Sequence, residues 1–317
     1  MKPPRRRLGR SELMVAPFAL GGNVFGWTVD EQRGFEILDE FVSAGYNLID
    51  TANVYSRWAP GHRGGESETL IGNWLRESGR REEVLLATKV GMDMGPDGKG
   101  LSPAHIRSAV AESLRRLRTD HIDLYQAHVD DAGTPLEDTL RAFDGLLQDG
   151  TIRAMGASNY AADRLGAALR CSQEAGLPRY ECVQPRYNLV DRRDFEGELE
   201  SLCRTEELGV ITYSSLASGF LSGKYRYPAD VSKSLRGERA IARLDERGRR
   251  ILSALDGVSE HLGAPHATIA LAWLMARPAV TAPIASATSL EQLRQLLDAA
   301  SLHLDADSLR QLDRASS

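Results

Sequence analysis

Seven short apolar segments of this chain each end on a polar or ionisable residue. They are residues 48–50, 84–89, 122–128, 152–158, 182–184, 210–213 and 280–286. Stretches with the spacing of amphipathic helices lie between them. Strands that are apolar along their length and alternate with helices are typical of a parallel sheet covered on both faces. We therefore predict one domain over residues 1–317, an α/β chain folded as a (β/α)8 TIM barrel whose first strand lies within residues 13–20.

The expected helices begin and end at recognisable capping residues. Asp30 is a predicted N-cap, and Ser102 is another, with a proline at the first helical position. Thr134 and Pro135 are expected to open a helix in the same way. Residues 224–237 are charged and lack periodicity, which indicates a mobile loop. Further helices are expected near residues 66–79, 161–175, 195–208, 238–261, 267–276, 289–299 and 305–314.

The polar strand ends bring reactive groups together if the barrel closes, because such barrels keep their active sites on that rim. Asp50, Lys89 and His128 would then meet, with Tyr55 just beyond the Asp50 strand. A phenol is a poor acid at neutral pH unless a cation stabilises its anion. Lys89 can supply the cation, Asp50 can hold it charged, and His128 can orient a substrate oxygen. These four residues are typical of an acid site for carbonyl reduction.

Composition narrows the class of protein. The chain has 317 residues, of which 42% are hydrophobic and 26% charged, with a net charge of −5. This is ordinary for a soluble globular protein and does not favour nucleic acid as a partner. No apolar run approaches the ~20 residues of a membrane helix. Three cysteines without zinc-site spacing indicate reduced thiols in a cytoplasmic protein.

Three familiar site signatures are missing. The stretch from Gly219 to Lys224 resembles a phosphate loop, but Ser218 stands where its first glycine is needed and Tyr225 replaces the Ser or Thr. No Gly-x-Gly-x-x-Gly joins a strand to a helix, so a Rossmann domain is not supported. No second histidine stands at metal-ligand spacing from His128, and we expect no metal.

Several motifs in order resemble the aldo-keto reductase family from near Leu8 to near Leu296. The resemblance is closest to bacterial members and to the branch that holds the potassium-channel β subunits. It implies Tyr55 as general acid, assisted by Lys89 and Asp50, with His128 orienting the carbonyl. The matching motifs are residues 8–11, 50–55, 65–68, 87–89, 123–128, 156–159, 183–188 and 219–225.

The same resemblance implies a nicotinamide cofactor. Its carboxamide would contact Ser158, Asn159 and Gln184, and its ring would stack on Tyr213. Further cofactor-binding residues are expected at three places. They are Gly22 and Asn23 after the first strand; Ser214, Ser215, Leu216, Gly219 and Lys224 at the pyrophosphate; and Ser286, Thr288, Gln292 and Gln295 at the adenosine end.

Two departures from the family bear on the nucleotide. Many members carry a Lys or Arg after the last strand that binds the 2′-phosphate of NADP, and residues 284–289 contain no cation here. Members of the channel-like branch use a hydroxyl at the Thr288 position and an arginine from the loop after Lys224. Arg236 could serve that role, so NADP is preferred over NAD, which stays possible. The second departure is Gln295-Leu296, where the family often has Glu-Asn around the adenine.

Three functions fit these residues. The leading one is a reductase that passes hydride between NADPH and an aldehyde or ketone, a small-molecule carbonyl substrate. The second is a nucleotide-binding regulatory or sensing subunit with slow turnover. The third is a Schiff-base lyase that uses Lys89, although a lysine held charged by Asp50 is a poor nucleophile. The sequence does not specify the oligomeric state. Trp27 and Trp58 suggest an aromatic rim suited to hydrophobic or ring-containing carbonyls.

Overall fold

Eight parallel strands close into a barrel in the computed structural model, which describes residues 3–317. The barrel strands are β3 (Ala19–Gly21), β4 (Leu48–Asp50), β5 (Leu85–Val90), β6 (Ile122–Ala127), β7 (Ile152–Ser158), β8 (Cys182–Gln184), β9 (Gly209–Thr212) and β10 (Ala282–Ala285). Two further strands, β1 (Arg6–Arg7) and β2 (Met14–Val15), form a separate antiparallel pair. Strands β3 to β10 follow one another around the barrel, and β10 pairs with β3 to close it. The predicted (β/α)8 barrel is confirmed. Met1 and Lys2 of the predicted domain lie outside the described residues.

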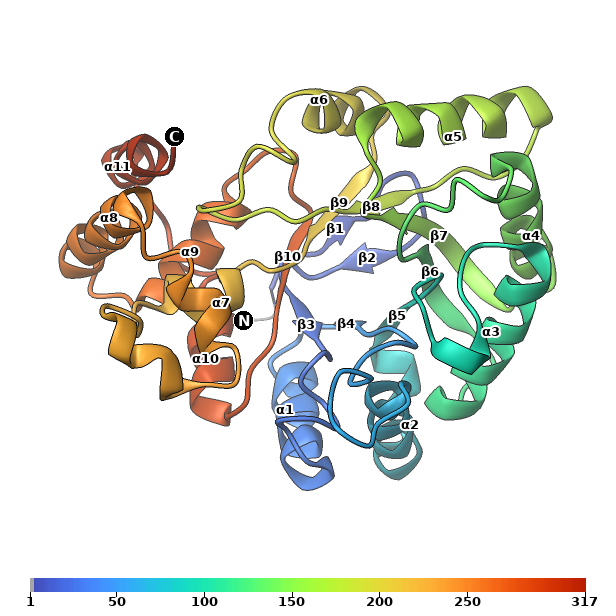
Figure 1. Ribbon diagram of the computed structural model, residues 1–317, viewed down its shortest axis with the longest axis horizontal. Helices are drawn as coiled ribbons and strands as arrows, with labels where there is room; N and C mark the ends of the chain where they lie inside the picture. The colour runs from blue at the N-terminus through green and yellow to red at the C-terminus, as the bar shows by residue number, and fades with distance from the viewer. Residues whose placement is uncertain (1–2) are drawn as a thin grey trace.

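The helices surround the strands on the outside (Figure 1). They are α1 (Glu31–Ser43), α2 (Glu66–Ser78), α3 (Pro103–Leu117), α4 (Leu136–Gln148), α5 (Ala162–Ala175), α6 (Glu198–Thr205), α7 (Gly237–Ile241), α8 (Glu246–Leu262), α9 (His266–Met275), α10 (Leu290–Asp298) and α11 (Ala306–Ser316). Short 3-10 turns are η1 (Arg81–Glu83), η2 (Gly95–Asp97), η3 (Ala217–Ser222) and η4 (Pro228–Lys233). The apolar faces of the α-helices pack on the outer side chains of the barrel strands.

Most helix boundaries follow the capping residues seen in the sequence. Asp30 and Ser102 accept hydrogen bonds from the N–H groups three residues later, as N-caps do. The third expected cap is wrong, because Pro135 itself occupies the N-cap position and the Thr134 hydroxyl donates to Asp131 instead. The helix expected over residues 238–261 is two helices in the structure: α7 ends at Ile241, and Asp245 is the N-cap of α8.

The bottom of the barrel is closed by a small antiparallel hairpin. Residues 13–20 were expected to form one strand, but β2 pairs with β1 and only β3 joins the barrel. Pro17, which has no N–H for a ladder, lies between them. Leu8, Leu13 and Val15 of this hairpin pack against the inward side chains of the barrel strands. The hairpin fills the lower end and leaves the carboxyl ends of the strands open for a site.

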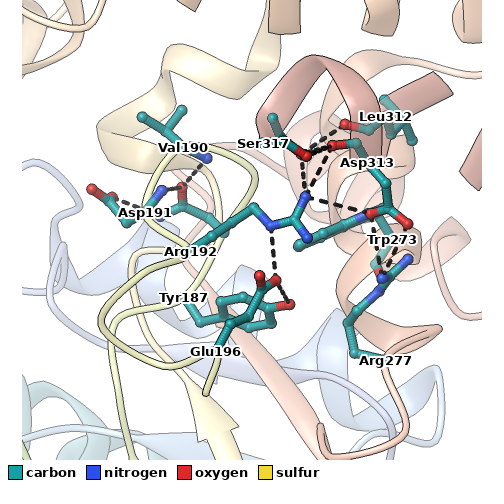
Figure 2. Close-up of polar contacts among 12 residues, drawn as sticks. Tyr187, Val190, Asp191, Arg192, Glu196, Trp273, Arg277, Leu312, Asp313 and Ser317 are labelled. Atoms are coloured by element: carbon teal, nitrogen blue, oxygen red, sulfur yellow. Dashed lines mark hydrogen bonds and ion pairs between the residues drawn. The ribbon is translucent and has the colours of Figure 1, made fainter. Parts of the chain in front are cut away.

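A polar cluster fastens the C-terminal helix α11 to the barrel (Figure 2). The Arg192 guanidinium donates to Glu196 Oε1 at 2.8 Å and lies 3.6 Å from the Asp313 carboxylate. Asp313 also accepts a hydrogen bond of 2.9 Å from the Trp273 indole and pairs with Arg277 at 3.3 Å. One carboxylate of α11 therefore holds both α9 and the segment that follows β8.

Candidate active site

The four predicted catalytic side chains meet at the carboxyl ends of β4, β5 and β6. Lys89 Nζ lies 2.7 Å from Asp50 Oδ2 and 3.0 Å from the Tyr55 hydroxyl, and it also donates to the Thr51 carbonyl oxygen at 2.8 Å. The Tyr55 hydroxyl is 3.4 Å from Asp50 Oδ2. The His128 ring lies 6.0 Å from the Tyr55 ring, centroid to centroid. One ammonium group therefore contacts both the carboxylate and the phenol.

Burial and the ion pair decide the protonation states of this group. The Lys89 side chain is fully buried, and burial alone would lower its pKa; the adjacent Asp50 and Tyr55 outweigh burial and raise it. Burial is also the largest influence on the phenol and raises the pKa of Tyr55 to about 12, although Lys89 opposes this shift. Lysine is thus charged and tyrosine protonated at neutral pH. Lys89 acts in the direction that the sequence predicted, but burial is the larger influence and the pKa of Tyr55 is raised overall.

His128 is a neutral hydrogen-bonding group in this environment. Its side chain sits just after β6, and burial together with the nearby Lys89 charge holds its pKa well below the ordinary value. Its Nδ1 atom is buried and has no hydrogen-bond partner among the described residues. A buried polar atom without a partner is uncommon in folded proteins. Neutral imidazole can donate from one nitrogen, which suits a group that orients a carbonyl oxygen.

Two glutamines donate hydrogen bonds to the Asp50 carboxylate. Gln184 Nε2 donates to Asp50 Oδ1 at 2.8 Å and to Gln126 Oε1 at 3.2 Å, and Gln126 Nε2 lies 3.5 Å from the same carboxylate oxygen. The sequence placed Gln126 within a motif but gave it no role. Its signal was a polar side chain in the middle of a buried strand. Asp50 therefore accepts hydrogen bonds from four donors, counting Lys89 and the Tyr55 hydroxyl.

The residues expected at the nicotinamide carboxamide lie together at the carboxyl ends of β7 and β8. Ser158 Oγ donates to the Gln184 carbonyl oxygen at 2.9 Å, and Asn159 Nδ2 donates to the His128 carbonyl oxygen at 2.9 Å. Tyr213, just after β9, donates its hydroxyl to Asn159 Oδ1 at 2.7 Å. Asn159 adopts φ 58°, a left-handed conformation that asparagine tolerates better than most other residues. The Tyr213 ring is therefore oriented by the amide of Asn159, which follows β7, two strands away around the barrel.

The segment after β9 has the backbone of an anion-binding turn. Ser214, Ala217, Ser218 and Gly219 all have positive φ, between 49° and 90°. The N–H groups of Ser215 and Leu216, which were expected at the pyrophosphate, donate to no acceptor among residues 3–317. Amide groups that converge in such a turn bind phosphate oxygens. The residues present therefore fit a nucleotide pyrophosphate.

Side chains behind this turn hold it in place. Asn188 Nδ2 donates to the Ser214 carbonyl oxygen at 3.0 Å and to Asp191 at 2.9 Å. Lys233 Nζ donates to the Lys224 carbonyl oxygen at 2.7 Å, which brings a second cation to the same segment. Sequence reasoning missed both Asn188 and Lys233. Each contact depends on where the loops lie in space.

The residues expected at the adenosine end lie near β3, β10 and the start of α10. Ser286 Oγ donates to Asn23 Oδ1 at 2.5 Å, so the ends of β10 and β3 meet there. Gly22, beside Asn23, has its N–H bonded to the Asp50 carbonyl oxygen at 2.7 Å. Thr288 donates its backbone N–H and its hydroxyl to Gln292 Oε1, each at 3.0 Å. The carbonyl oxygen of Gln295 accepts a hydrogen bond from Thr268.

Arg236 lies at the aromatic rim rather than beside Thr288. Its guanidinium is 5.3 Å from the Trp27 ring centroid, and no hydrogen bond or ion pair joins it to another residue of the described chain. Trp27 meets Trp58 at 5.6 Å, and Trp58 meets Tyr55 at 6.0 Å. An unbroken row of aromatic contacts therefore runs from Arg236 to the candidate acid.

Comparison with known proteins agrees with this arrangement. The sequence profile of the aldo/keto reductase family matches residues 17–317. The chain belongs to the aldo/keto reductase family. It is 38% identical over 315 residues to the uncharacterized oxidoreductase YrpG of Bacillus subtilis, covering 96% of this chain and 94% of that protein. The resemblance noted in the sequence is confirmed, and the family supports NAD(P)-dependent oxidoreduction in general.

Two other relatives differ in what their names describe. A probable voltage-gated potassium channel subunit beta of Oryza sativa subsp. japonica is 34% identical, with 91% of this chain and 88% of that protein covered. The norsolorinic acid reductase of Aspergillus flavus is 28% identical, with 95% and 78% covered. This aldo/keto reductase thus resembles both reductases and channel subunits. None of its described helices has the length and apolar character needed to cross a membrane.

Proposed function

We propose that this protein is an NADP(H)-dependent reductase of aldehydes or ketones that uses Tyr55 as its general acid. The observation that carries the proposal is the single ammonium group of Lys89, in contact with both Asp50 at 2.7 Å and Tyr55 at 3.0 Å. A phenol with a buried cation beside it can give up its proton, because the cation stabilises the phenolate. The reverse reaction, oxidation of an alcohol, uses the same groups.

The chain's own residues divide the work of proton transfer. Tyr55 donates its hydroxyl proton to the carbonyl oxygen of the substrate. Lys89 stabilises the phenolate that remains, and Asp50 holds Lys89 in place. His128, neutral because its pKa is lowered, donates a hydrogen bond that orients the carbonyl oxygen. When bound, the reduced nicotinamide would supply the hydride.

The nucleotide would lie along the strand ends from β7 to β10. Ser158, Asn159 and Gln184 would hold the carboxamide, and Tyr213 would lie against the ring. The turn at residues 214–219 would hold the pyrophosphate. NADP is preferred over NAD because Thr288 and Gln292 would offer polar groups to the 2′-phosphate at the adenosine end. The expected contact between Arg236 and the 2′-phosphate stays a prediction; the position of Arg236 supports another role, argued below.

The proposal is tested with a panel of aldehydes, ketones and sugars, followed by absorbance of the reduced nicotinamide with NADPH and with NADH. Tyr55→Phe keeps the ring and removes the proton donor, so kcat should fall at least ~100-fold, while nucleotide affinity measured by fluorescence titration stays near native. Tyr227→Phe, at an exposed position, is the matched control. Near-native turnover of the Tyr55 variant would show that another group is the acid.

A second candidate is a nucleotide-binding regulatory subunit, which is favoured by the similarity to a probable channel subunit. The turnover rate and the amount of nucleotide retained through purification distinguish the two functions. A reductase should complete many cycles at about 1 s⁻¹ or faster with a good substrate. Slower turnover on every carbonyl, with nucleotide retained through purification and a stable partner complex, would favour the regulatory subunit. A Schiff-base lyase is not favoured, because the raised pKa of Lys89 keeps the amine protonated.

A further inference from the structure

Arg236 is a cation without an anion at the entrance to the candidate active site. It is half-buried, and among the described residues nothing accepts a hydrogen bond from its guanidinium. The Arg236 guanidinium lies over the Trp27 ring. Such a cation–π contact depends on the charge of the guanidinium and occupies none of its five N–H donors. Those donors remain available. Most other arginines that are half-buried in this chain donate to carboxylates or carbonyl oxygens, as Arg116 does to Glu68.

The surroundings of Arg236 connect it to the substrate rather than to the adenosine end. Trp27 belongs to the loop after β3, and its edge meets Trp58, whose ring lies 6.0 Å from Tyr55. Burial and the nearby Arg239 charge lower the pKa of Arg236, while Tyr55 and Tyr225 are close enough to act in the opposite direction. By contrast, no contact joins its guanidinium to Thr288 or Gln292, whose hydrogen bonds are to each other.

The row of rings also limits the shape of a ligand that uses this cation. Trp58 is 49% exposed and stands between Tyr55 and Trp27, so it offers an open aromatic face. Stacking on such a face favours a planar apolar group. A ligand with a carbonyl at Tyr55 and an anionic group at Arg236 would cover Trp58 with whatever joins the two.

We propose that Arg236 binds an anionic group of the substrate, so that this enzyme prefers carbonyl compounds in which an aromatic or similarly flat spacer joins the carbonyl to a carboxylate. The proposal rests on the proposed reductase function and names the substrate class of the same site. Arg236 would be a specificity-determining residue, since a guanidinium binds carboxylate in a bidentate manner and lysine does not.

The kinetic test compares 4-carboxybenzaldehyde with its methyl ester, which has nearly the same shape and no charge. The native protein should prefer the carboxylate in kcat/KM, mainly through KM. Arg236→Ala should reduce the ratio of the two kcat/KM values by about tenfold or more, and Arg236→Lys should restore it only in part. Arg249→Ala, which removes an exposed cation of α8, is the control and should leave the ratio unchanged. A ratio that is the same in the native protein and in Arg236→Ala overturns the proposal.

A different outcome would assign Arg236 to the nucleotide-binding site. If Arg236→Ala slows both aldehydes equally and weakens NADPH binding while NADH binding is kept, the guanidinium binds the 2′-phosphate and the substrate proposal is wrong. Both affinities are measured by fluorescence titration of the same variants.

Binding without turnover separates this inference from the proposed function. Benzoate and benzamide are titrated into the native protein while tryptophan fluorescence is recorded, because Trp27 stacks on the guanidinium. Benzoate should change the signal and benzamide should not, and the change should disappear in Arg236→Ala and shrink in Trp27→Phe. If no carbonyl is reduced but benzoate still binds in this way, the reductase function fails and the anion site stands. If benzoate does not bind at millimolar concentration, the anion site fails whatever the turnover.

Discussion

Removing the charge of Lys89 should affect both the fold and the chemistry, because the buried ion pair belongs to both. In Lys89→Met the Asp50 carboxylate keeps its hydrogen bond of 2.8 Å from Gln184 but loses the cation at 2.7 Å. In Asp50→Asn the opposite happens, and a buried ammonium group loses its counter-ion and keeps only neutral acceptors, among them the Thr51 carbonyl and the Tyr55 hydroxyl. Each single variant therefore leaves one buried charge without a partner of opposite sign.

The size of the effect follows from that residual charge. Breaking a buried ion pair by removing one partner costs about 3–5 kcal/mol of unfolding free energy, because the other charge is left uncompensated. The double variant has no buried charge, so its loss should be well below the ~6–10 kcal/mol that the two single losses would give together. Turnover should be lost in all three variants, since none retains both the cation and its support next to the phenol.

Urea unfolding followed by circular dichroism gives the four unfolding free energies of this cycle. The expected result is a double variant that is at least as stable as either single variant. If the losses at Lys89 and Asp50 simply add, the two charges do not compensate each other in the folded state and the assignment of a coupled pair is wrong. If Lys89→Met unfolds at the native urea concentration, the lysine is not buried as described.

Two further predictions concern pH and packing. Burial lowers the pKa of His128 well below 6.5, so the unfolded chain takes up a proton as the pH falls through 6.5 and the folded chain does not. The unfolding free energy should therefore decrease as the pH is lowered, by up to ~1.4 kcal/mol per pH unit. His128→Gln should reduce this pH dependence in urea unfolding between about pH 5.5 and 7.5. The lowered pKa of His266 adds a slope of the same sign, which should persist in that variant. Gly72→Ala would bring a methyl group to 2.1 Å from the Arg116 carbonyl oxygen where α2 packs on α3, so stability should fall by about 1–3 kcal/mol. Gly145→Ala, at an open helical position, should instead gain ~0.5–1 kcal/mol, and an equal effect of both substitutions would contradict the close helix contact.

The strand pattern predicted the barrel because a buried parallel strand leaves a strong local signal. Each of the seven apolar segments lies at a barrel strand or includes one, and the helix caps at Asp30 and Ser102 follow from side chains that are near in sequence. The errors arose where local signals were ambiguous. Thr134 was expected as a cap, but its hydroxyl found an acceptor in Asp131.

The contacts of the site were less predictable because they join distant parts of the chain. Asp50 and Gln184 are 134 residues apart, and their hydrogen bond exists only because β4 and β8 face each other inside the closed barrel. The strand ends predicted that these residues share a rim, and no local pattern predicts which of them touch. Arg236 illustrates the same limit, since its loop has no periodicity and the contact with Trp27 depends on how that loop lies.

In the proposed reductase, the position of Lys89 explains why an acid with a high pKa is suited to this site. A proton donor must hold its proton until a substrate oxygen is present, and the raised pKa of Tyr55, about 12, ensures this at neutral pH. Once the proton has left, the phenolate would be a buried anion, which is costly unless a cation is already beside it. Lys89 lies 3.0 Å away and is itself kept charged by Asp50. Burial therefore retains the proton before transfer, and the prearranged ammonium group lowers the cost of the charge that transfer creates.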